Sequence, residues 1–584
     1  MSGPPRWVAS PSMVRSPPAA PDSASRYPPG DGSAGDVGGV EGEALDPRRW
    51  FTLVIVISAA LIVVLDNSVL NVAIPTILRE FHTTLPSVQW VVTGYALTFA
   101  SLLIIGGRLG DLYGHRRIFI IGASLFGAGS LLASVSWSVG SLIAGEAIIE
   151  GIGASLMLPA TLAILSTTFK GPERGPAFAV WGATAGAAAA LGPVVGGFLT
   201  TEYSWRWAFR INVIIAPAAI VGALLVMAKG ERDPQRRQID IPGAALIATG
   251  MFLLVFGLSE GPSYGWLIPT KDFAAFGTTV WPMSTPISMI PVVFLVAVVI
   301  LVGFYRLERV KERDDRAPLF EFGQLRHPTF RYGLLTTIVL AMGQLGLLFV
   351  LPVFLQDGKH LSAETNGLWV LPTGLFIVVG AQVGGRLTRR IGPTAVARTG
   401  LALETVGLLA IAFAVSPQLT FLSLLPGFAF YGVGIGFASS QLTNIVLTAI
   451  RKEKAGAASG ANTTARQIGS ALGVAVIGGL LTAETVRHAV PAVSQSSLPA
   501  RVKAQAAAGL HALGPNFAPP SHAGAHTVTV LRDILDSAVA AGTRPALFFA
   551  ATVVGAGACL SFLIPRVGVP VEIDDVDVLE AAEA

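Results

Sequence analysis

Charged residues lie well inside the long apolar runs of this 584-residue chain, away from the run ends: Asp66, Glu146, Glu150, Glu404 and Arg466. A charge at the centre of a bilayer costs about 2.5–3.5 kcal/mol or more, so such residues usually face an interior cavity or pair with another charge. A carboxylate there can lower its cost by binding a proton, because desolvation favours its neutral form. The four acids are therefore candidates for reversible proton binding. Arg466 is the remaining intramembrane cation, and the sequence leaves its partner open.

Three of these acids are expected at similar depth. Glu146 and Glu150 are four positions apart and share one helix face. Asp66 is about 15 residues into the first apolar run, roughly 22 Å, and Glu150 is about 9–10 residues into the fourth, roughly 14 Å from the opposite side. In a hydrocarbon core about 30 Å thick these depths are similar. The three acids could therefore line one cavity, although Glu146 could instead lie at the membrane interface.

The composition indicates a membrane protein. Hydrophobic residues make up 52% of the chain and charged residues only 13%, whereas soluble proteins carry about 25% charged residues. The single cysteine, Cys559, excludes an intramolecular disulfide. No histidine pair has metal-ligand spacing inside a span, and no glycine-rich loop ends in Lys-Ser or Lys-Thr, which argues against an ATP-driven pump. We expect no metal and no cofactor, and the net charge of +4 gives no indication of nucleic-acid binding.

Fourteen apolar runs predict an all-α integral membrane protein with fourteen transmembrane helices. Lys and Arg concentrate in the even-numbered links, which by the positive-inside rule places these links and both termini in the cytoplasm. Each run is long enough for about one bilayer crossing, and the runs lie at roughly 51–73, 88–106, 118–137, 141–165, 177–200, 207–228, 241–258, 289–305, 332–355, 366–385, 396–415, 421–447, 459–482 and 545–564.

The segments between and around these runs predict the domain boundaries. Residues 1–49 are rich in Pro, Ser, Gly and Asp and lack a signal-peptide core, so we expect a disordered cytoplasmic tail. Residues 566–584 form an acidic cytoplasmic tail. Between the tails we expect a six-helix half at 50–228, two inserted helices with cytoplasmic links at 229–331, and a second six-helix half at 332–565 that includes a long extracytoplasmic link at 483–544.

A short charged segment, Gly107 to Arg117, separates the second and third runs and is expected to be a loop. Asp111 lies at its helix–loop junction, where a carboxylate can accept backbone N–H bonds at a helix N-terminus. A faint copy, Gly385 to Gly392, follows the tenth run, with Arg389 in the place of Asp111. Two related halves around a central cavity are therefore expected.

The charged segment resembles the signature loop of the major facilitator superfamily, and the fourteen-span layout resembles the drug:proton antiporter branch of that family, the EmrB/QacA type. The resemblance covers about 50–565 and includes Leu65–Pro75, Gln89–Tyr95, Ser204–Phe209 and Ala465–Gly469. It implies a conformational latch on the cytoplasmic side, formed by Gly107, Arg108, Asp111, Gly114, Arg116 and Arg117. The alternative is a charge cluster that only sets membrane orientation.

The fifth run carries a second motif of this resemblance, in Gly192, Pro193, Gly196 and Gly197. Gly192 and Gly196 lie on one helix face and allow close helix approach, and Pro193 removes a backbone donor and bends the helix. The resemblance implies an antiporter helix that forms a sealed pair and prevents proton leak. Ordinary small-residue packing is the alternative.

The fourth run departs from the family pattern. Relatives usually carry Arg-x-x-Gln-Gly there, but here Ala147 and Glu150 occupy the arginine and glutamine positions before Gly151. The chain therefore lacks a cation and gains acids, so the role of that arginine does not transfer. This replacement favours a cavity that accepts cations or protons over one that binds anions.

The resemblance implies a proton-coupled secondary active exporter of amphipathic small molecules such as drugs or antibiotics. It would work by alternating access as a monomer in the cell membrane, with protons and a small molecule as its partners, and would not be an enzyme. A proton-linked uptake carrier, a membrane enzyme and a non-transporting sensor stay open as alternatives. Polar residues that could line the substrate cavity, or equally serve packing, are Asn71, Trp90, Tyr95, Gln344, Gln382, Asn444 and Arg466.

Overall fold

Each of the fourteen predicted runs lies largely in helix, which confirms an all-α membrane fold. The computed structural model describes residues 47–83, 85–228, 240–275, 278–314, 316, 318–517, 519 and 524–567, so almost all of both predicted tails lies outside the described residues. Within them, 13 helical segments are long and apolar enough to cross a membrane. The remaining predicted run, 177–200, lies in helix α6 (Arg174–Glu202).

The N-terminal half contains six membrane-length helical segments, and the fourth of them is interrupted by π-helical turns. Its helices are α1 (Arg49–Glu80), α2 (Leu85–Tyr113), α3 (His115–Ser134), α4 (Val139–Leu142) with the π-helix Ile143–Glu150 and α5 (Gly151–Thr168), then α6 and α7 (Trp207–Val226). The inserted pair follows as α8 (Ile241–Tyr264) and α9 (Met289–Arg313). An antiparallel two-stranded sheet lies between them, formed by β1 (Phe273–Ala275) and β2 (Thr278–Trp281).

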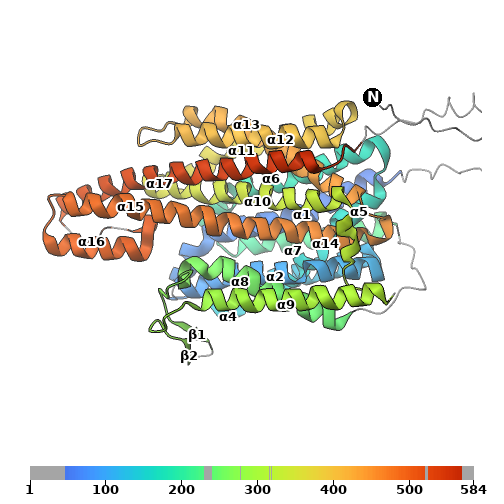
Figure 1. Cartoon of the computed structure of the whole chain (residues 1–584), viewed down its shortest axis with the longest axis horizontal. Coiled ribbons are helices and arrows are strands. Elements are labelled where there is room, and N and C mark those ends of the chain that lie inside the picture. Colours follow the sequence, from blue (N-terminus) through green and yellow to red (C-terminus); the bar gives the residue numbers. More distant parts are fainter. Residues whose placement is uncertain are drawn as a thin grey trace, which may run out of the picture. The chain divides into compact units, whose positions relative to one another are not determined.

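The C-terminal half has a corresponding set of helices (Figure 1). They are α10 (Pro328–Val353), α11 (Ala363–Ile391), α12 (Pro393–Ala414), α13 (Phe421–Thr448), α14 (Ala455–Leu472) with the π-helix Gly473–Gly478 and α15 (Gly479–Gln495), then α16 (Ala500–Leu513) and α17 (Ala525–Leu560).

Much of the segment 483–544, expected as a long link, is helical. Helix α15 continues to Gln495, α16 follows, and α17 begins at Ala525 rather than near 545. Figure 1 shows α15, α16 and α17 extending together beyond the ends of the other helices. Buried Leu510 of α16 belongs to the same apolar cluster as Leu531 and Leu535 of α17. The sequence of this segment is too polar for a membrane span but suits a helix that packs on its neighbours.

In both halves the third and fourth membrane segments pack backbone against backbone. A Cβ atom added to Gly129 would lie 2.7 Å from the carbonyl oxygen of Gly145, and one added to Gly434 would lie 2.7 Å from that of Gly400. Gly129 and Gly407, both in such contacts, are 278 positions apart, the same offset as between the two charged segments. The repeat seen faintly in sequence is therefore also a repeat of helix contacts.

We expect Gly434→Ala to destabilise the fold. The added Cβ would lie 2.4 Å from the backbone nitrogen of Glu404, and forcing atoms into a packed core costs about 1–3 kcal/mol. Gly303→Ala in α9 is the matched control, because a Cβ there meets nothing within 4 Å and alanine gains up to about 1 kcal/mol of helix propensity. Melting temperatures of the purified variants test this. A Gly434→Ala protein that melts at or above the parent would contradict the packing argument.

Candidate functional site

Three predicted acids lie together inside the N-terminal half. Asp66 on α1 is 1% exposed, and Glu146 and Glu150 on the π-helix are fully buried. One carboxylate oxygen from each lies within 4.8 Å of the others. We call Asp66, Glu146 and Glu150 the acid cluster. The placement at similar depth follows the helix geometry expected from sequence, and Glu146 is not at a membrane surface of the bundle.

Two residues that sequence reasoning missed support the cluster. The Asn212 side chain on α7 donates hydrogen bonds from Nδ2 to Oδ1 of Asp66 (2.7 Å) and to Oε1 of Glu150 (3.1 Å). The Ser130 hydroxyl on α3 donates to the same Glu150 oxygen (2.6 Å). A single amide inside the apolar run of α7 was the available signal for Asn212; Ser130 had none, because hydroxyls are common in membrane helices.

Most oxygens of the cluster lack a donor. Oδ2 of Asp66, both carboxylate oxygens of Glu146 and Oε2 of Glu150 are buried without an N–H or hydroxyl donor, and Glu146 lies within hydrogen-bonding reach of both Asp66 and Glu150. Among the described residues no Lys or Arg contributes to the electrostatics of these three acids. Three carboxylates this close cannot all stay ionised in a medium of low dielectric constant. The arrangement is chemically suited to binding protons or another cation.

The fourth predicted acid stands apart from the cluster. Glu404 on α12 is fully buried in the C-terminal half, and neither of its oxygens has a hydrogen-bond partner. Arg466 on α14, whose partner the sequence left open, donates to the hydroxyl of Ser439 (3.0 Å). Glu404 interacts with Arg466 electrostatically. The structure thus separates the predicted acids into a cluster of three and one residue near a cation.

The predicted cavity residues are dispersed. Trp90 stacks on Phe256 of α8, with ring centroids 6.2 Å apart, so it packs between helices. Gln344 is buried and accepts through its backbone carbonyl from the Tyr431 hydroxyl (3.2 Å). Asn444 is also buried, whereas Gln382 is partly buried. Tyr95, which is 3% exposed, lies close enough to interact with all three acids of the cluster. The side chain of Asn71 lies outside the described residues.

Asp111 joins the two halves. Its Oδ1 accepts from the backbone N–H of Gly456 (2.7 Å) and its Oδ2 from that of Ala457 (2.8 Å), at the start of α14. A carboxylate at this end of a helix is stabilised by the helix dipole and the free N–H groups. A Cβ added to Gly107 would lie 2.1 Å from the carbonyl oxygen of Gly456, so the two backbones touch.

The expected loop between the second and third spans is reduced to one residue. Helix α2 continues to Tyr113 and α3 begins at His115, so only Gly114 breaks the helix. Its φ of 93° lies in the region that favours glycine. Of the basic residues, Arg116 donates from Nη2 to the carbonyl of Leu224 near the end of α7 (2.7 Å), whereas Arg117 is exposed and Arg108 is half-buried. The charged segment is therefore a helix end plus a tight turn.

The faint second copy of this segment faces a residue of opposite charge. Arg389, in the place of Asp111, interacts electrostatically with Glu173, which precedes α6 of the other half. Glu173 also accepts from Nε and Nη2 of Arg49 (2.7 and 2.9 Å). These contacts, hydrogen bonding from Arg49 first, hold the pKa of Glu173 below its usual value.

The motif of the fifth span lies in α6, which runs without interruption from Arg174 to Glu202. A Cβ added to Gly196 would lie 3.0 Å from the Cα of Val69, so α6 packs closely on α1. Gly192 is buried, whereas a Cβ on Gly197 would meet nothing within 4 Å. The side chain of Pro193 lies outside the described residues.

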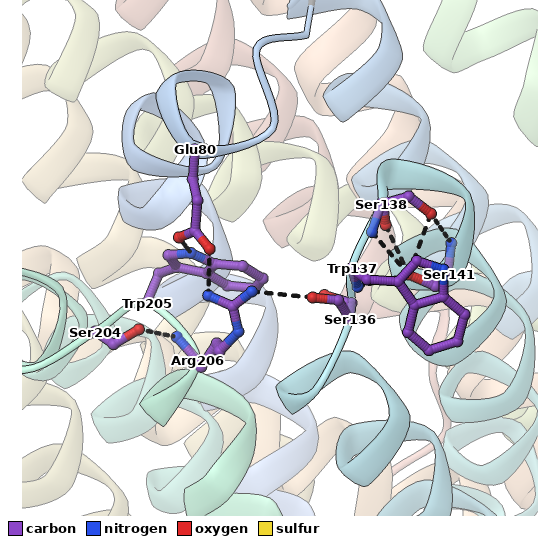
Figure 2. Close-up of polar contacts among 8 residues, drawn as sticks. All are labelled: Glu80, Ser136, Trp137, Ser138, Ser141, Ser204, Trp205 and Arg206. Carbon is purple, nitrogen blue, oxygen red and sulfur yellow. Dashed lines mark hydrogen bonds and ion pairs between the residues drawn. The ribbon is translucent and has the colours of Figure 1, made fainter.

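A polar network closes the end of the half opposite to Asp111 (Figure 2). Glu80 at the end of α1 accepts from Nε1 of Trp205 (2.6 Å) and from Nη1 of Arg206 (2.5 Å). Arg206 also donates to the carbonyl of Ser136 (2.9 Å) and lies over the Trp205 ring. Trp205 and Arg206 belong to the predicted motif Ser204–Phe209. The network ties three connections of the N-terminal half together.

Comparisons with known proteins agree with this architecture. Residues 56–474 match the model of the Major Facilitator Superfamily. The chain is 35% identical over 80% of its length to a probable actinorhodin transporter of Streptomyces coelicolor, covering 79% of that protein. It is 33% identical over 76% of its length to the puromycin resistance protein pur8 of Streptomyces alboniger, covering 84% of it.

More distant matches extend this pattern. The multidrug resistance protein Stp of Mycobacterium tuberculosis is 28% identical over 75% of the chain, which covers 77% of that protein. The solved structure of the human organic anion transporter MFSD10 has a TM-score of 0.54 at 13% identity, covering 88% of this chain and 100% of the other. This last likeness concerns the fold alone.

We expect Asp111→Asn to weaken the contact between the halves. The change removes a charge that accepts two backbone N–H bonds, and hydrogen bonds to a charged group contribute about 1.5–3 kcal/mol. Arg117 and Arg451 are exposed and lie at the same end of the two halves. Spin labels attached to Arg117→Cys and Arg451→Cys, in a Cys559→Ser background, report the distance between the halves. The variant should populate longer distances, and the exposed Glu453→Gln should not. Identical distance distributions for Asp111→Asn and the parent would contradict the hypothesis that Asp111 is a conformational latch.

We expect the Glu80 network to stabilise the fold above about pH 4.5 and not in acid. Burial raises the pKa of Glu80, but hydrogen bonds from Trp205 and Arg206 outweigh it and leave the pKa below the ordinary 4.5. A lowered folded-state pKa means that the stabilisation is present above 4.5 and is lost as the pH falls through the folded value. Because 42% of the Glu80 side chain is exposed, the effect is modest.

Melting temperatures measured from pH 7 to pH 3 check this. The difference between the parent and Glu80→Gln should shrink below pH 4.5, while Glu202→Gln, an exposed acid at the end of α6, should follow the parent throughout. A constant difference between the parent and Glu80→Gln at all pH values would show that ionisation of Glu80 is irrelevant.

Proposed function

The chain belongs to the Major Facilitator Superfamily, and we propose that it is a proton-coupled secondary active exporter of amphipathic small molecules of the drug or antibiotic class. The names of its relatives, which describe antibiotic transport and antibiotic or multidrug resistance, support the substrate class. The observation that carries the proposal is the acid cluster: three buried carboxylates on two helical segments, without an ion pair to any described Lys or Arg.

Coupling follows from the shared environment of these acids. Asn212 bonds both Asp66 and Glu150, so the protonation of one changes the hydrogen bonding offered to the other. We assign the transported proton to Asp66 and Glu150, with Glu146 assisting. Protons that enter from outside neutralise the cluster and displace a bound cationic substrate. Opening to the cytoplasm releases the proton, and the substrate binds again.

The missing arginine of the fourth span supports a cationic substrate. Ala147, at the arginine position, is 1% exposed. A Cβ added to Gly94 of α2 would lie 2.9 Å from the Cβ of Ala147, so α2 packs closely on this side of Ala147. Without a fixed cation beside it, the cluster can exchange its charge with mobile cations: protons and positively charged amphipaths.

Alternating access uses the contact between Asp111 and α14. In this arrangement the halves touch at the Asp111 end, and the basic links at that end assign it to the cytoplasm. Opening there breaks two charge-assisted hydrogen bonds, and closing restores them. Since both halves are present in one chain, the protein works as a monomeric carrier in the cell membrane with both termini in the cytoplasm, and not as an enzyme.

We expect the double variant Asp66→Asn/Glu150→Gln to stop efflux driven by a proton gradient. Neutral side chains cannot take up and release protons, although binding and energy-independent exchange can persist. Proteoliposomes that contain ethidium, a fluorescent cationic amphipath, measure efflux on imposing a pH gradient, and an uncoupler should abolish efflux in the parent. Ethidium accumulation under the same gradient would favour an uptake carrier.

Proton release from the purified protein on adding ethidium gives an independent measurement. The parent should release protons, and the double variant should release far fewer. If both release equal amounts, the coupling site lies elsewhere, and Glu404 becomes the next acid to test by Glu404→Gln.

A further inference from the structure

The acid cluster has the ligands of a metal site as well as those of a proton site, and we propose that it binds one hard divalent cation of the size of Ca²⁺ in competition with protons. Its three carboxylates come from α1 and from the π-helix of the fourth membrane segment, and all are at most 1% exposed. The inference rests on the geometry of Asp66, Glu146 and Glu150 and does not require the proposed exported substrate.

The oxygens of the cluster suit a cation of this radius. Ca²⁺ binds oxygen ligands at about 2.3–2.6 Å, so two ligands on opposite sides of the ion are about 4.6–5.2 Å apart. For Mg²⁺, at about 2.0–2.1 Å, opposite ligands are only about 4.0–4.2 Å apart, and the geometry must be nearly octahedral. The three carboxylate oxygens lie within 4.8 Å of one another, which is no more than the separation of two opposite ligands on one Ca²⁺ ion.

The free lone pairs of the cluster are available for such an ion. Asn212 and Ser130 donate to Asp66 Oδ1 and Glu150 Oε1, but four carboxylate oxygens have no donor from outside the cluster. Buried polar groups without a partner each cost about 1–3 kcal/mol. Oxygen-only sites of carboxylates and other hard ligands favour Ca²⁺, Mg²⁺ and Mn²⁺ over softer metals.

A buried hydroxyl outside the cluster is a second observation in favour of a bound cation. Tyr95 of α2 is 3% exposed, its hydroxyl has no hydrogen-bond partner, and it interacts electrostatically with each of the three acids. A phenol oxygen is a further hard ligand from a third helix. The site therefore combines three carboxylates with a neutral oxygen that nothing else among the described residues engages.

Charge balance predicts how this binding is observed. The three carboxylates carry three negative charges when fully ionised, and a divalent cation neutralises two of them. Protons held by the acids therefore leave when the cation binds. For each proton displaced per cation, the apparent affinity falls about tenfold for every pH unit of acidification. Metal binding and proton release are thus two readouts of one event.

The test uses the purified full-length protein in detergent, weakly buffered near neutral pH. We expect CaCl₂ to release protons to an indicator dye, radioactive Ca²⁺ to bind saturably at one ion per chain, and binding to weaken as the pH falls. MgCl₂ should need a higher concentration. NaCl at equal ionic strength should release no protons, and release equal to that with CaCl₂ would overturn the proposal.

Matched variants locate the site. Glu146→Gln should lower the affinity for Ca²⁺ at least tenfold, and Tyr95→Phe by a smaller factor, while Glu260→Gln, an acid on α8, should bind as the parent does. Absence of saturable Ca²⁺ binding in the parent, or binding unchanged by Glu146→Gln, overturns the inference. Ca²⁺ binding by the parent protein tests the inference without any variant, so a variant that fails to fold does not prevent the test. If the parent binds Ca²⁺ but shows no ethidium efflux, the proposed function is rejected and the inference of a Ca²⁺ site is not.

Discussion

The carboxylate of Asp111, buried between two backbone N–H groups of α14, is the contact on which the arrangement of the halves depends. It is 1% exposed, and a charge so far from water needs the two hydrogen bonds and the positive end of the helix dipole. The close contact of Gly107 with Gly456 is what brings the carboxylate within reach. Side chains larger than hydrogen at either position would separate the helices and break these two hydrogen bonds.

Asp111 and the acid cluster differ in the groups that could compensate a buried carboxylate charge. Asp111 accepts two backbone N–H bonds at the positive end of α14, whereas no described Lys or Arg is among the groups that act on the three acids of the cluster. The helix repeat shows how the two halves differ in this respect. Gly129 packs on Glu150 in the first half, and Gly407 packs on Tyr431 at the corresponding contact of the second. The second half therefore places a phenol where the first half places an acid, and its own acid, Glu404, lies near the cation Arg466.

The sequence predicted what depends on long apolar runs and on charge, because those signals are strong and local. The helices at the fourteen runs and the meeting of Asp66 with Glu150 follow from run length and rise per residue. The preference of carboxylates for free N–H groups predicts a helix N-terminus for Asp111, but the sequence did not show that this helix is α14 of the other half. Sequence reasoning missed the π-helix before Gly151, because i to i+5 bonding carries no composition signal. It also expected a loop at Gly107–Arg117, since charge and glycine usually indicate one, whereas tertiary contacts extend α2 to Tyr113.

The inserted helices α8 and α9 pack on the N-terminal half and are linked to each other. Helix α8 packs on α2 through Phe256 and Trp90, and α2 is also the helix that carries Asp111. The two inserted helices are joined by an ion pair between Asp240, the N-cap of α8, and Lys311 of α9. Glu308 of α9 accepts the backbone N–H of Phe320 (3.0 Å), which fixes the chain on its way to α10. The pair therefore braces the helix that makes the contact between the halves, and among the described residues it adds no acid to the cluster. Its contacts are therefore structural, and the three acids of the cluster lie on α1 and the fourth membrane segment.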